Sequence, residues 1–305
     1  MERLVTLFGG GGFLGRYVAQ ALLRAGARVR IAERDPSDAW FLKSLGQLGG
    51  THLVRADVTD AASVRRAAQG SDAVVNLVGI LKGDFEKVHV TGAGNVAAAA
   101  ADAGAAALVQ ISAIGADPAS PAAYGRSKAA GEAAVREAFP AATIIRPSVL
   151  FGPEDQFVNR FAGLARMLPV LPVVGGAAKL QPAWVADVAN AVAAAALDPA
   201  THGGKTYELG GPEVMTMAAL NRWIGEATGR SRHVYEVPDA MAGLLAMLPG
   251  GPITADQLRM LSRDNVASGE GFAAFGITPA PLAAIAPNWL VRYRPRGRFS
   301  DVKSA

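Results

Sequence analysis

The chain has 305 residues, of which 50% are hydrophobic and 18% are charged. These totals exclude an intrinsically disordered protein and allow one large α/β unit or two unequal domains. With no cysteine and four scattered histidines, disulfides and thiolate chemistry are excluded and no metal site is expected. No apolar run approaches the length of a membrane-spanning helix, and no leader is expected at the N-terminus. We therefore expect a soluble, cytosol-facing protein.

Two C-terminal features predict docking. The net charge of +4 lies wholly after Asn288, where Arg292, Arg294, Arg296, Arg298 and Lys303 oppose Asp301 alone and accompany Trp289 and Tyr293. Residues 241–248 are eight consecutive apolar residues, too short to span a bilayer. They suit an apolar groove or the membrane interface, or else a core helix. We predict a protein or membrane partner for this part, a tail from residue 288 that the nucleotide fold does not need, and no nucleic-acid partner.

A glycine-rich turn near the N-terminus organises the predicted fold. Residues 4–8 have the length and apolar character of a buried strand, and an amphipathic helix begins at Phe13. The three glycines spaced three apart, Gly9, Gly12 and Gly15, permit close approach to a pyrophosphate at a helix N-terminus. The predicted nucleotide contacts in the turn are Gly9, Gly11, Gly12, Phe13, Leu14 and Gly15.

The end of the second predicted strand, residues 27–32, is the position that reads the adenosine ribose. An acidic residue there normally binds the ribose hydroxyls of NAD, whereas an arginine neutralises the extra phosphate of NADP. The sequence has both, as Glu33 and Arg34. We favour NADP(H) and keep NAD(H) as the alternative, with no metal cofactor.

Strands and helices alternate through the first half of the chain. Further strands are predicted at residues 52–56, 73–77, 108–111 and 143–146, with helices between them. This alternation predicts an α/β fold, a doubly wound parallel Rossmann sheet with a smaller, helix-rich C-terminal part. We place a dinucleotide-binding domain at residues 1–150, with segments near 183–212 returning to it, and a substrate or docking domain at 151–305. Further cofactor contacts are predicted at the strand ends, namely Asp57, Val58, Leu77, Val78 and Gly79.

A serine, a tyrosine and a lysine are spaced for carbonyl chemistry. Tyr124 and Lys128 lie four apart in a predicted helix and should share one face. A lysine about 4 Å from a tyrosine would lower the pKa of the phenol by roughly three units at an effective dielectric of about 20. Ser112, at the end of the preceding strand, could hold the substrate oxygen. These three are the predicted catalytic residues, and Tyr124 and Lys128 are also predicted to contact the cofactor.

With these motifs in hand, the chain resembles the short-chain dehydrogenase/reductase superfamily in its extended or atypical branch. The glycine spacing and the Ser112, Tyr124 and Lys128 trio match that branch. Residues 146–148 (RPS) match a stretch that closes over the nicotinamide, which implies cofactor contacts at Pro147, Ser148 and Val149. Residues 184–188 and 207–212 (YELGGP) match two later motifs of the branch.

More narrowly, the chain resembles the bacterial relatives of the nucleotide-binding accessory subunit of respiratory complex I. Residues 156–161 (QFVNRF), 248–265 (LPGGPITADQLRMLSRDN) and 293–299 (YRPRGRF) carry this resemblance. It implies a tightly held structural nucleotide, peripheral-arm partners and a location on the cytoplasmic face of the bacterial inner membrane. His89 stands where active members of the branch commonly have a relay asparagine, which implies little turnover. The alternatives are a free-standing NAD(P)H-dependent reductase or dehydrogenase, and a sugar-nucleotide epimerase.

Overall fold

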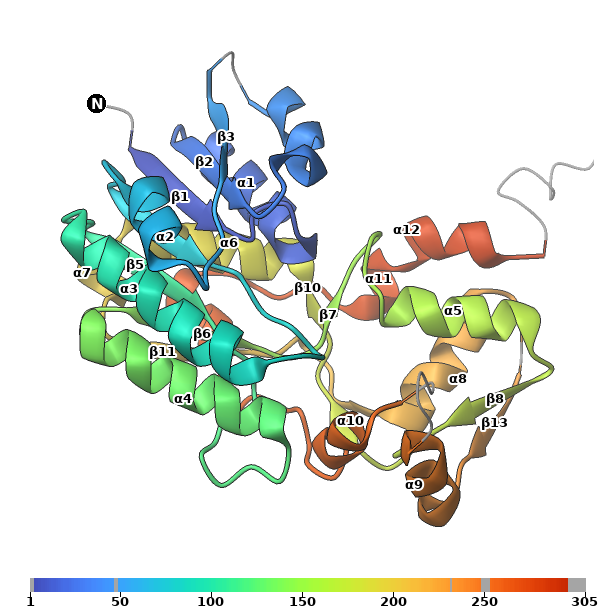
Figure 1. The fold of residues 1–305 in the computed structure, drawn as a ribbon. Helices are drawn as coiled ribbons and strands as arrows, with labels where there is room; N and C mark the ends of the chain where they lie inside the picture. The colour runs from blue at the N-terminus through green and yellow to red at the C-terminus, as the bar shows by residue number, and fades with distance from the viewer. Residues whose placement is uncertain (1–2, 47–48, 231, 248–252, 296–305) are drawn as a thin grey trace, which may run out of the picture. The chain divides into compact units, whose positions relative to one another are not determined.

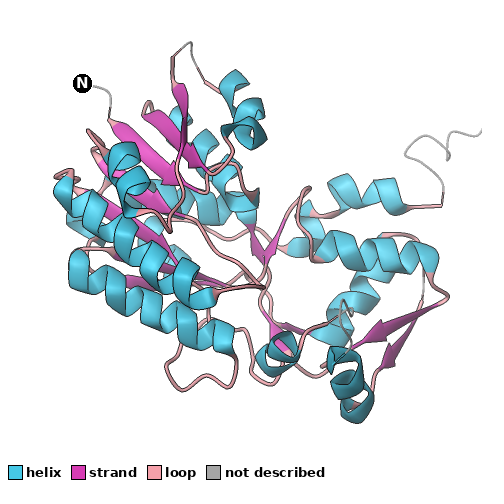
Figure 2. Cartoon of the chain, in the orientation of Figure 1, coloured by secondary structure: helices cyan, strands magenta, loops and turns pink. Residues whose placement is uncertain are grey.

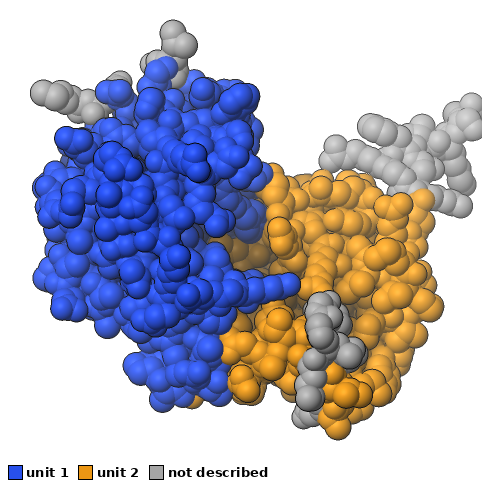
Figure 3. All heavy atoms as spheres, viewed as in Figure 1, with its two compact units in different colours: residues 1–147, 185–209, 268–278 blue, residues 148–184, 210–267, 279–305 orange. Residues whose placement is uncertain are grey.

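The computed structural model describes residues 3–46, 49–230, 232–247 and 253–295, which form two compact units. The first unit combines Met1–Pro147, Val185–Leu209 and Ser268–Thr278, and the second combines Ser148–Trp184, Gly210–Ala267 and Pro279–Ala305 (Figure 3). The return of residues 268–278 to the first unit was not anticipated, because that short segment has neither strand nor helix periodicity.

The first unit is built on a seven-stranded parallel sheet in the order β11-β6-β5-β4-β1-β2-β3 (Figure 1). Its strands are β1 Leu4–Phe8, β2 Arg28–Glu33, β3 Thr51–Arg55, β4 Ala73–Asn76, β5 Ala107–Ile111, β6 Thr143–Pro147 and β11 Thr206–Leu209. The chain winds outward from β1 in both directions, which is the order of a Rossmann fold. The predicted fold class is confirmed.

Helices cover both faces of this sheet (Figure 2). One face carries α1 (Phe13–Arg24) against α6 (Val185–Leu197), and the other carries α2 (Ala61–Ala68), α3 (Gly92–Asp102) and α4 (Ala123–Ala138) side by side. Asp60 caps α2 as predicted, because its carboxylate accepts the N–H groups of Ala62 and Ser63. The remaining elements of this unit are η1 Pro36–Ser44, η2 Glu86–Thr91, α7 Pro199–His202 and η3 Gly271–Phe275.

The core of the first unit fits the alanine-rich sequence. Apolar strand residues such as Phe8, Val74 and Ile144 are buried against α3, where Val96 and several alanines are also buried. Small side chains let this helix lie close to the sheet and to α4. Gly131 of α4 lies equally close to η2, because a Cβ there would lie only 2.0 Å from the carbonyl oxygen of His89.

The second unit is smaller and mixed. Its elements are β7 Leu150–Phe151, α5 Val158–Met167, β8 Val170–Val173, β9 Lys179–Leu180, β10 Ala183–Trp184, β12 Met215–Thr216, α8 Met217–Ala227, β13 His233–Glu236, α9 Asp239–Met247, α10 Ala255–Met260, α11 Leu282–Ile285, α12 Pro287–Leu290 and η4 Val291–Tyr293. Its core is aromatic, because the rings of Phe151, Trp184 and Trp289 pack together, with Trp184 and Trp289 stacked 5.6 Å apart.

The first residues of the tail predicted for docking pack in this core. Trp289 and Leu290 are buried in the second unit, and Arg292 donates to the carbonyl of Pro153 at 2.7 Å. The tail as far as residue 295 therefore belongs to the second unit. The sequence pattern alone could not show which of its aromatic residues is buried. Arg296, Arg298, Asp301 and Lys303 lie outside the described residues.

The apolar run 241–248 forms most of α9. Met241 and Leu244 are exposed, by 49% and 64%, while Ala242 is buried. The helix thus presents large apolar side chains to solvent and is not simply a core helix. Leu248 and the four residues after it lie outside the described part of the chain. No helix among the described residues is long and apolar enough to cross a membrane.

Candidate functional site

The glycine turn follows β1 and requires glycine at its third position. A Cβ on Gly15 would lie 2.5 Å from the carbonyl oxygens of both Gly9 and Gly10, a contact that no side chain can make. Gly9 has φ +80°, a conformation that glycine adopts without strain. Gly10, which the sequence analysis did not single out, is also constrained, because its Cβ would lie 2.8 Å from Ile31.

The N-terminus of α1 suits a phosphate group. Gly12 is the N-cap residue, and no side chain caps the first turn, which contains no acidic residue. The first-turn amides of Phe13 and Leu14 therefore lie at the positive end of the helix dipole with no side-chain cap. The ring of Phe13 packs edge-on against Tyr17 at 6.0 Å, which keeps it beside the turn. These features fit a dinucleotide pyrophosphate.

Two residues, Glu33 and Arg34, occupy the ribose-reading position after β2. Glu33 turns back and accepts the N–H of Gly11 at 2.6 Å, and burial raises the pKa of its carboxyl. Arg34 is exposed, and its positive charge favours the ionised form of the carboxyl groups of both Glu33 and Asp57. Glu33 therefore helps to hold the glycine turn, while the guanidinium of Arg34 is the exposed cation at this strand end.

The other strand ends lie along the same edge of the sheet. After β3, Asp57 accepts the N–H and the hydroxyl of Thr59, which lower the pKa of its carboxyl, and the carbonyl of Val58 accepts the side chain of Asn95. After β4, Leu77 and Val78 lie against Gly9, so close that a Cβ on that glycine would lie about 3.1 Å from Val78.

The predicted catalytic residues lie near the carboxyl end of β5. Lys128 is buried, its Nζ donates to the carbonyl of Ile111 at 3.3 Å, and Ser112 is the next residue. The same Nζ lies 5.8 Å from the centre of the Tyr124 ring. Gly79 leaves room for it, because a Cβ there would lie 3.1 Å from Nζ. The buried Ser112 hydroxyl has no hydrogen-bond partner among the described residues, which fits a site for a ligand oxygen.

The predicted lowering of the Tyr124 pKa is wrong. Burial raises the pKa of Tyr124 to about 12 and lowers that of Lys128 to about 8, although the carboxylate of Glu132 opposes the second shift. The lysine donates to a carbonyl and lies beside the face of the phenol ring. Because desolvation dominates both groups, the protein alone does not prepare Tyr124 to transfer a proton at neutral pH.

His89 connects the loop after β4 to the catalytic helix. Its Nε2 accepts the N–H of Ile80 at 3.0 Å, and Nδ1 bonds to the hydroxyl of Ser127 at 2.9 Å, which in turn donates to the carbonyl of Tyr124. The histidine lies in the π-helical segment η2 and stacks on Phe85. Burial, together with the charge of Lys128, lowers the pKa of His89 to about 4, so the ring is neutral at pH 7.

His89 should make stability depend on pH. The pKa of about 4 lies below the ordinary value of 6.5, so the unfolded chain binds more protons between these values. Its contribution to the free energy of unfolding should be present above pH 6.5 and fall by up to about 3 kcal/mol by pH 4. Urea titrations from pH 7.5 to 4 should show a flatter dependence for His89→Gln, whereas the exposed-site control His233→Gln should follow the wild type. Parallel curves for all three proteins would contradict this assignment.

Two groups of contacts were missed by sequence reasoning. Arg146 donates to both carboxylate oxygens of Glu132, at 2.8 and 2.7 Å, and lies 3.4 Å from Glu208. These pairs hold the guanidinium inside the first unit. Glu132 stands four residues after Lys128, so helical spacing could have indicated its place. The contacts of Arg146 with Glu208 join distant segments and left no local signal.

The last predicted cofactor residues follow β6. The carbonyl of Pro147 accepts the N–H of Ile114 within the first unit. Ser148 and Val149 begin the second unit, where both bond to Asn265 rather than standing open to solvent. Asn265 lies in the stretch 248–265 that carries the resemblance, but nothing in the sequence indicated these bonds.

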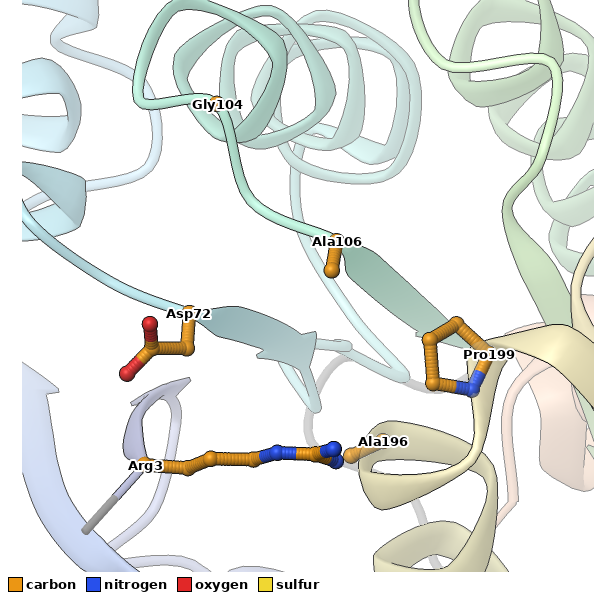
Figure 4. Close-up of a pocket in the computed structure, with 6 residues that line it drawn as sticks. All are labelled: Arg3, Asp72, Gly104, Ala106, Ala196 and Pro199. Atoms are coloured by element: carbon orange, nitrogen blue, oxygen red, sulfur yellow. The ribbon is translucent and has the colours of Figure 1, made fainter. Parts of the chain in front are cut away.

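A small pocket lies near the amino ends of the strands, opposite the glycine turn (Figure 4). It is lined by Arg3, Asp72, Gly104, Ala106, Ala196 and Pro199. Asp72 accepts the N–H of Leu4, and the Arg3 side chain bonds to the carbonyl of Leu197. These residues precede or flank the amino ends of the strands, so this pocket is not the dinucleotide site. The described residues contain no group of three or more histidine, aspartate or glutamate side chains that could hold a metal ion.

The Rossmann sheet and the glycine turn define the chain as an NAD(P)-binding protein. The model of the NAD dependent epimerase/dehydratase family matches residues 5–210. The mitochondrial NADH dehydrogenase (ubiquinone) 1 alpha subcomplex subunit 9 of Rattus norvegicus is 36% identical over 304 residues, which cover 95% of this chain and 80% of that protein. The chain belongs to the NAD dependent epimerase/dehydratase family, and within it to the family of this complex I subunit.

Two further similarities extend the comparison. A ceramide reductase of Caulobacter vibrioides is 34% identical over 191 residues, which cover 61% of this chain and 58% of that protein. The crystal structure of an NADPH-dependent quinone oxidoreductase from Escherichia coli, complexed with NADPH, has a TM-score of 0.74 at 23% identity. That likeness covers 94% of this chain and 99% of the other, and it supports the fold alone.

Proposed function

We propose that the protein is an accessory subunit of respiratory complex I that holds a dinucleotide as part of its structure. The observation that carries this proposal is the extent of the likeness to the rat complex I subunit. It covers 95% of the chain and therefore includes the second unit, whereas the dinucleotide family model ends at residue 210. The sequence stretches 156–161, 248–265 and 293–299 are the part that an ordinary epimerase would not be expected to share.

The bound nucleotide is proposed to be NADP(H), with NAD(H) as the alternative. Arg34 is exposed at the end of β2, where a 2′-phosphate would need a cation. Glu33 already accepts a hydrogen bond from Gly11 and is flanked by this arginine, which offsets its repulsion of a phosphate. The uncapped N-terminus of α1 receives the pyrophosphate. When bound, the nucleotide supplies hydride chemistry, but its proposed role here is structural.

The second unit is the proposed docking part. It carries exposed large apolar side chains, namely Met167, Val170, Val214, Tyr235, Met241 and Leu244. The excess positive charge of the sequence lies in the same unit, near its C-terminal end. Exposed apolar side chains and arginines suit a partner subunit and an anionic membrane surface. We place the protein peripherally on the cytoplasmic face of the bacterial inner membrane, against subunits of the peripheral arm of complex I.

A second candidate is a free-standing NAD(P)H-dependent reductase. Ser112, Tyr124 and Lys128 lie at one edge of the sheet, and the relative from Caulobacter vibrioides is named as a ceramide reductase. Against this stand the raised pKa of Tyr124 and the neutral, fully bonded His89 at the relay position. A sugar-nucleotide epimerase is supported only by the broad family model.

Turnover separates these candidates. We expect little or no hydride transfer with aldehydes, ketones, long-chain lipid ketones or quinones, because burial holds the Tyr124 proton. The measurement is NADPH and NADH oxidation by the purified protein, with Tyr124→Phe as the matched variant that lacks only the phenol oxygen. Similar residual rates for both proteins fit the subunit. Rapid turnover that disappears in Tyr124→Phe would favour the reductase.

A further inference from the structure

Two amide side chains are buried side by side in the sheet of the first unit. Asn76 is the last residue of β4 and is 2% exposed, and Gln110, its register partner on β5, is 5% exposed. The Nδ2 of Asn76 donates to the Oε1 of Gln110 at 2.8 Å. Burying amide groups costs free energy unless their polar atoms are bonded, and apolar side chains would avoid that cost. Packing alone therefore does not favour this pair.

Each end of the amide pair bonds to a different part of the candidate site. The Oδ1 of Asn76 accepts the N–H of Val78 at 3.1 Å, and the Nε2 of Gln110 donates to the carbonyl of Ile111 at 2.9 Å. These backbone groups fix the orientation of both amides, because an N–H must face an amide oxygen and a carbonyl must face an amide nitrogen. The series of hydrogen bonds therefore runs without a break from the loop after β4 to the end of β5.

One end of this series lies at the glycine turn. The N–H of Leu77 donates to the carbonyl of Phe8 at 2.9 Å, which ties the start of the loop to the end of β1. Val78 lies against Gly9, where an added Cβ would be 3.1 Å from the valine side chain and 3.2 Å from its nitrogen. By accepting the N–H two residues further on, Asn76 sets the turn that brings Val78 to this place.

The other end of the series holds Lys128. The carbonyl of Ile111, which accepts the Gln110 amide, also accepts the Nζ of the buried Lys128 at 3.3 Å. Gln110 therefore fixes the acceptor to which the ammonium group bonds. An ammonium group has three protons, so one bond to Ile111 leaves donors for a ligand. The loop after β4 passes directly beside it, because a Cβ on Gly79 would lie 3.1 Å from Nζ.

The strand order indicates which half of a dinucleotide Lys128 faces. Ligands of such sheets bind outside the carboxyl ends of the strands, with the pyrophosphate at the turn after β1 and the adenosine ribose at the end of β2. In the order β11-β6-β5-β4-β1-β2-β3, the strands β4 and β5 lie on the other side of β1 from β2. Because Lys128 bonds to the last residue of β5, its ammonium group belongs to the nicotinamide half.

We propose that Gln110 is a positioning residue for Lys128 and, through it, for the nicotinamide half of the bound dinucleotide. Gln110 does not touch the nucleotide. It fixes the carbonyl of Ile111, while Asn76 links that carbonyl to Val78 at the glycine turn, so that the ammonium group keeps a set place relative to the pyrophosphate site. This inference rests on the proposed nucleotide-binding function, and it gives a role to two buried amides that packing alone does not favour.

The test compares two ligands that share the adenosine half. NADPH is one probe, and 2′-phospho-ADP, which lacks nicotinamide and its ribose, is the other; NADH and ADP form a parallel pair. Dissociation constants are measured by calorimetry on the full chain for the wild type and for Gln110→Met, which keeps the length of the side chain but removes both hydrogen bonds. We expect Gln110→Met to weaken NADPH by about tenfold and 2′-phospho-ADP by less than about twofold.

A double-mutant cycle with Lys128→Met shows whether Gln110 acts through the lysine. Lys128→Met alone should also weaken NADPH more than 2′-phospho-ADP. Adding Gln110→Met to it should change NADPH affinity by less than about twofold further, because the group that Gln110 positions is already absent. If Gln110→Met does not fold, Gln110→Asn keeps a buried amide but is one methylene group shorter, and it should give a smaller loss with the same selectivity and the same dependence on Lys128.

Thr6→Val is the matched control. The hydroxyls of Thr6 and Ser71 form another buried side-chain hydrogen bond in the same unit, at 2.7 Å, but they lie away from the amide pair. Removing this bond without changing the shape of the side chain should lower stability and leave the affinities of all four probes unchanged. The comparison separates a general loss of stability from a loss of positioning.

The outcomes distinguish the inference from the function on which it rests. Equal weakening of NADPH and 2′-phospho-ADP, no weakening of either, or an undiminished effect of Gln110→Met in the Lys128→Met background would overturn the positioning role alone, provided that the wild type binds both probes. A wild type that binds none of the four probes would overturn the proposed nucleotide-binding function, and this inference with it.

Discussion

Gly15→Ala should lose its dinucleotide almost completely. The added methyl group would lie 2.5 Å from two carbonyl oxygens of the turn, so the turn must open or α1 must move away from β1. Either change displaces the helix N-terminus from the pyrophosphate, and we expect affinity for NADPH or NADH to fall by about a hundredfold or more. The strained packing should also lower the free energy of unfolding by about 1–3 kcal/mol. Calorimetry with each nucleotide, together with urea unfolding, measures both effects.

Gly94→Ala is the control for this experiment. Gly94 lies within α3 of the same unit, and a Cβ there would meet Ala134 at an ordinary 3.7 Å. Replacing a helical glycine by alanine without a clash should stabilise the unit by about 0.5–1 kcal/mol and leave nucleotide affinity unchanged. Wild-type affinity in Gly15→Ala would mean that the glycine turn does not bind the nucleotide.

Trp289→Ala should unfold the second unit at much lower denaturant than the wild type. The indole is 8% exposed and packs between Trp184 and Phe151, so its removal leaves a large cavity. Truncating a buried tryptophan in this way costs about 3–5 kcal/mol. Fluorescence and circular dichroism during urea unfolding should show an early transition, with the second unit unfolding before the Rossmann unit.

Trp40→Ala provides the comparison. Trp40 is 65% exposed and pairs with Lys43 in a cation–π contact at 5.9 Å, so its loss should cost less than about 1 kcal/mol. If Trp289→Ala were no more destabilising than Trp40→Ala, the assignment of Trp289 to the aromatic core of the second unit would be wrong. The same reasoning decides where to truncate a docking tail: removing residues 288–305 deletes the core side chains of Trp289 and Leu290, whereas removing 296–305 leaves these two in place.

The Rossmann sheet could be predicted because its signals are local. Each strand of the first half is a short apolar run between a turn and an amphipathic helix, and the run 4–8 coincides with β1. The glycine spacing predicted a tight turn, which the close contacts of Gly15 confirm. The π-helical segment 86–91 was not predicted, because the helical periodicity of the sequence does not reveal an extra residue per turn.

The candidate site was predicted in part. Helical spacing brought Tyr124 and Lys128 to one face of α4, and they do lie together. The direction of the Tyr124 pKa could not be predicted, because it depends on desolvation by residues such as Phe85 that are distant from it in sequence. For the same reason, the buried place of Trp289 and the hydrogen bonds of Asn265 to Ser148 and Val149 follow only from long-range packing.

The most direct test of the subunit assignment is the native assembly that contains the protein. Membranes solubilised in a mild detergent are separated by native electrophoresis, and the protein is located by a small C-terminal tag. We predict that it migrates with NADH:quinone oxidoreductase activity and that the excised complex releases about one NADP(H) for each copy of the chain. NAD(H) in its place would change only the assignment of Arg34. A protein that migrates only as a small soluble species, while complex I is intact in the same gel, would contradict the account.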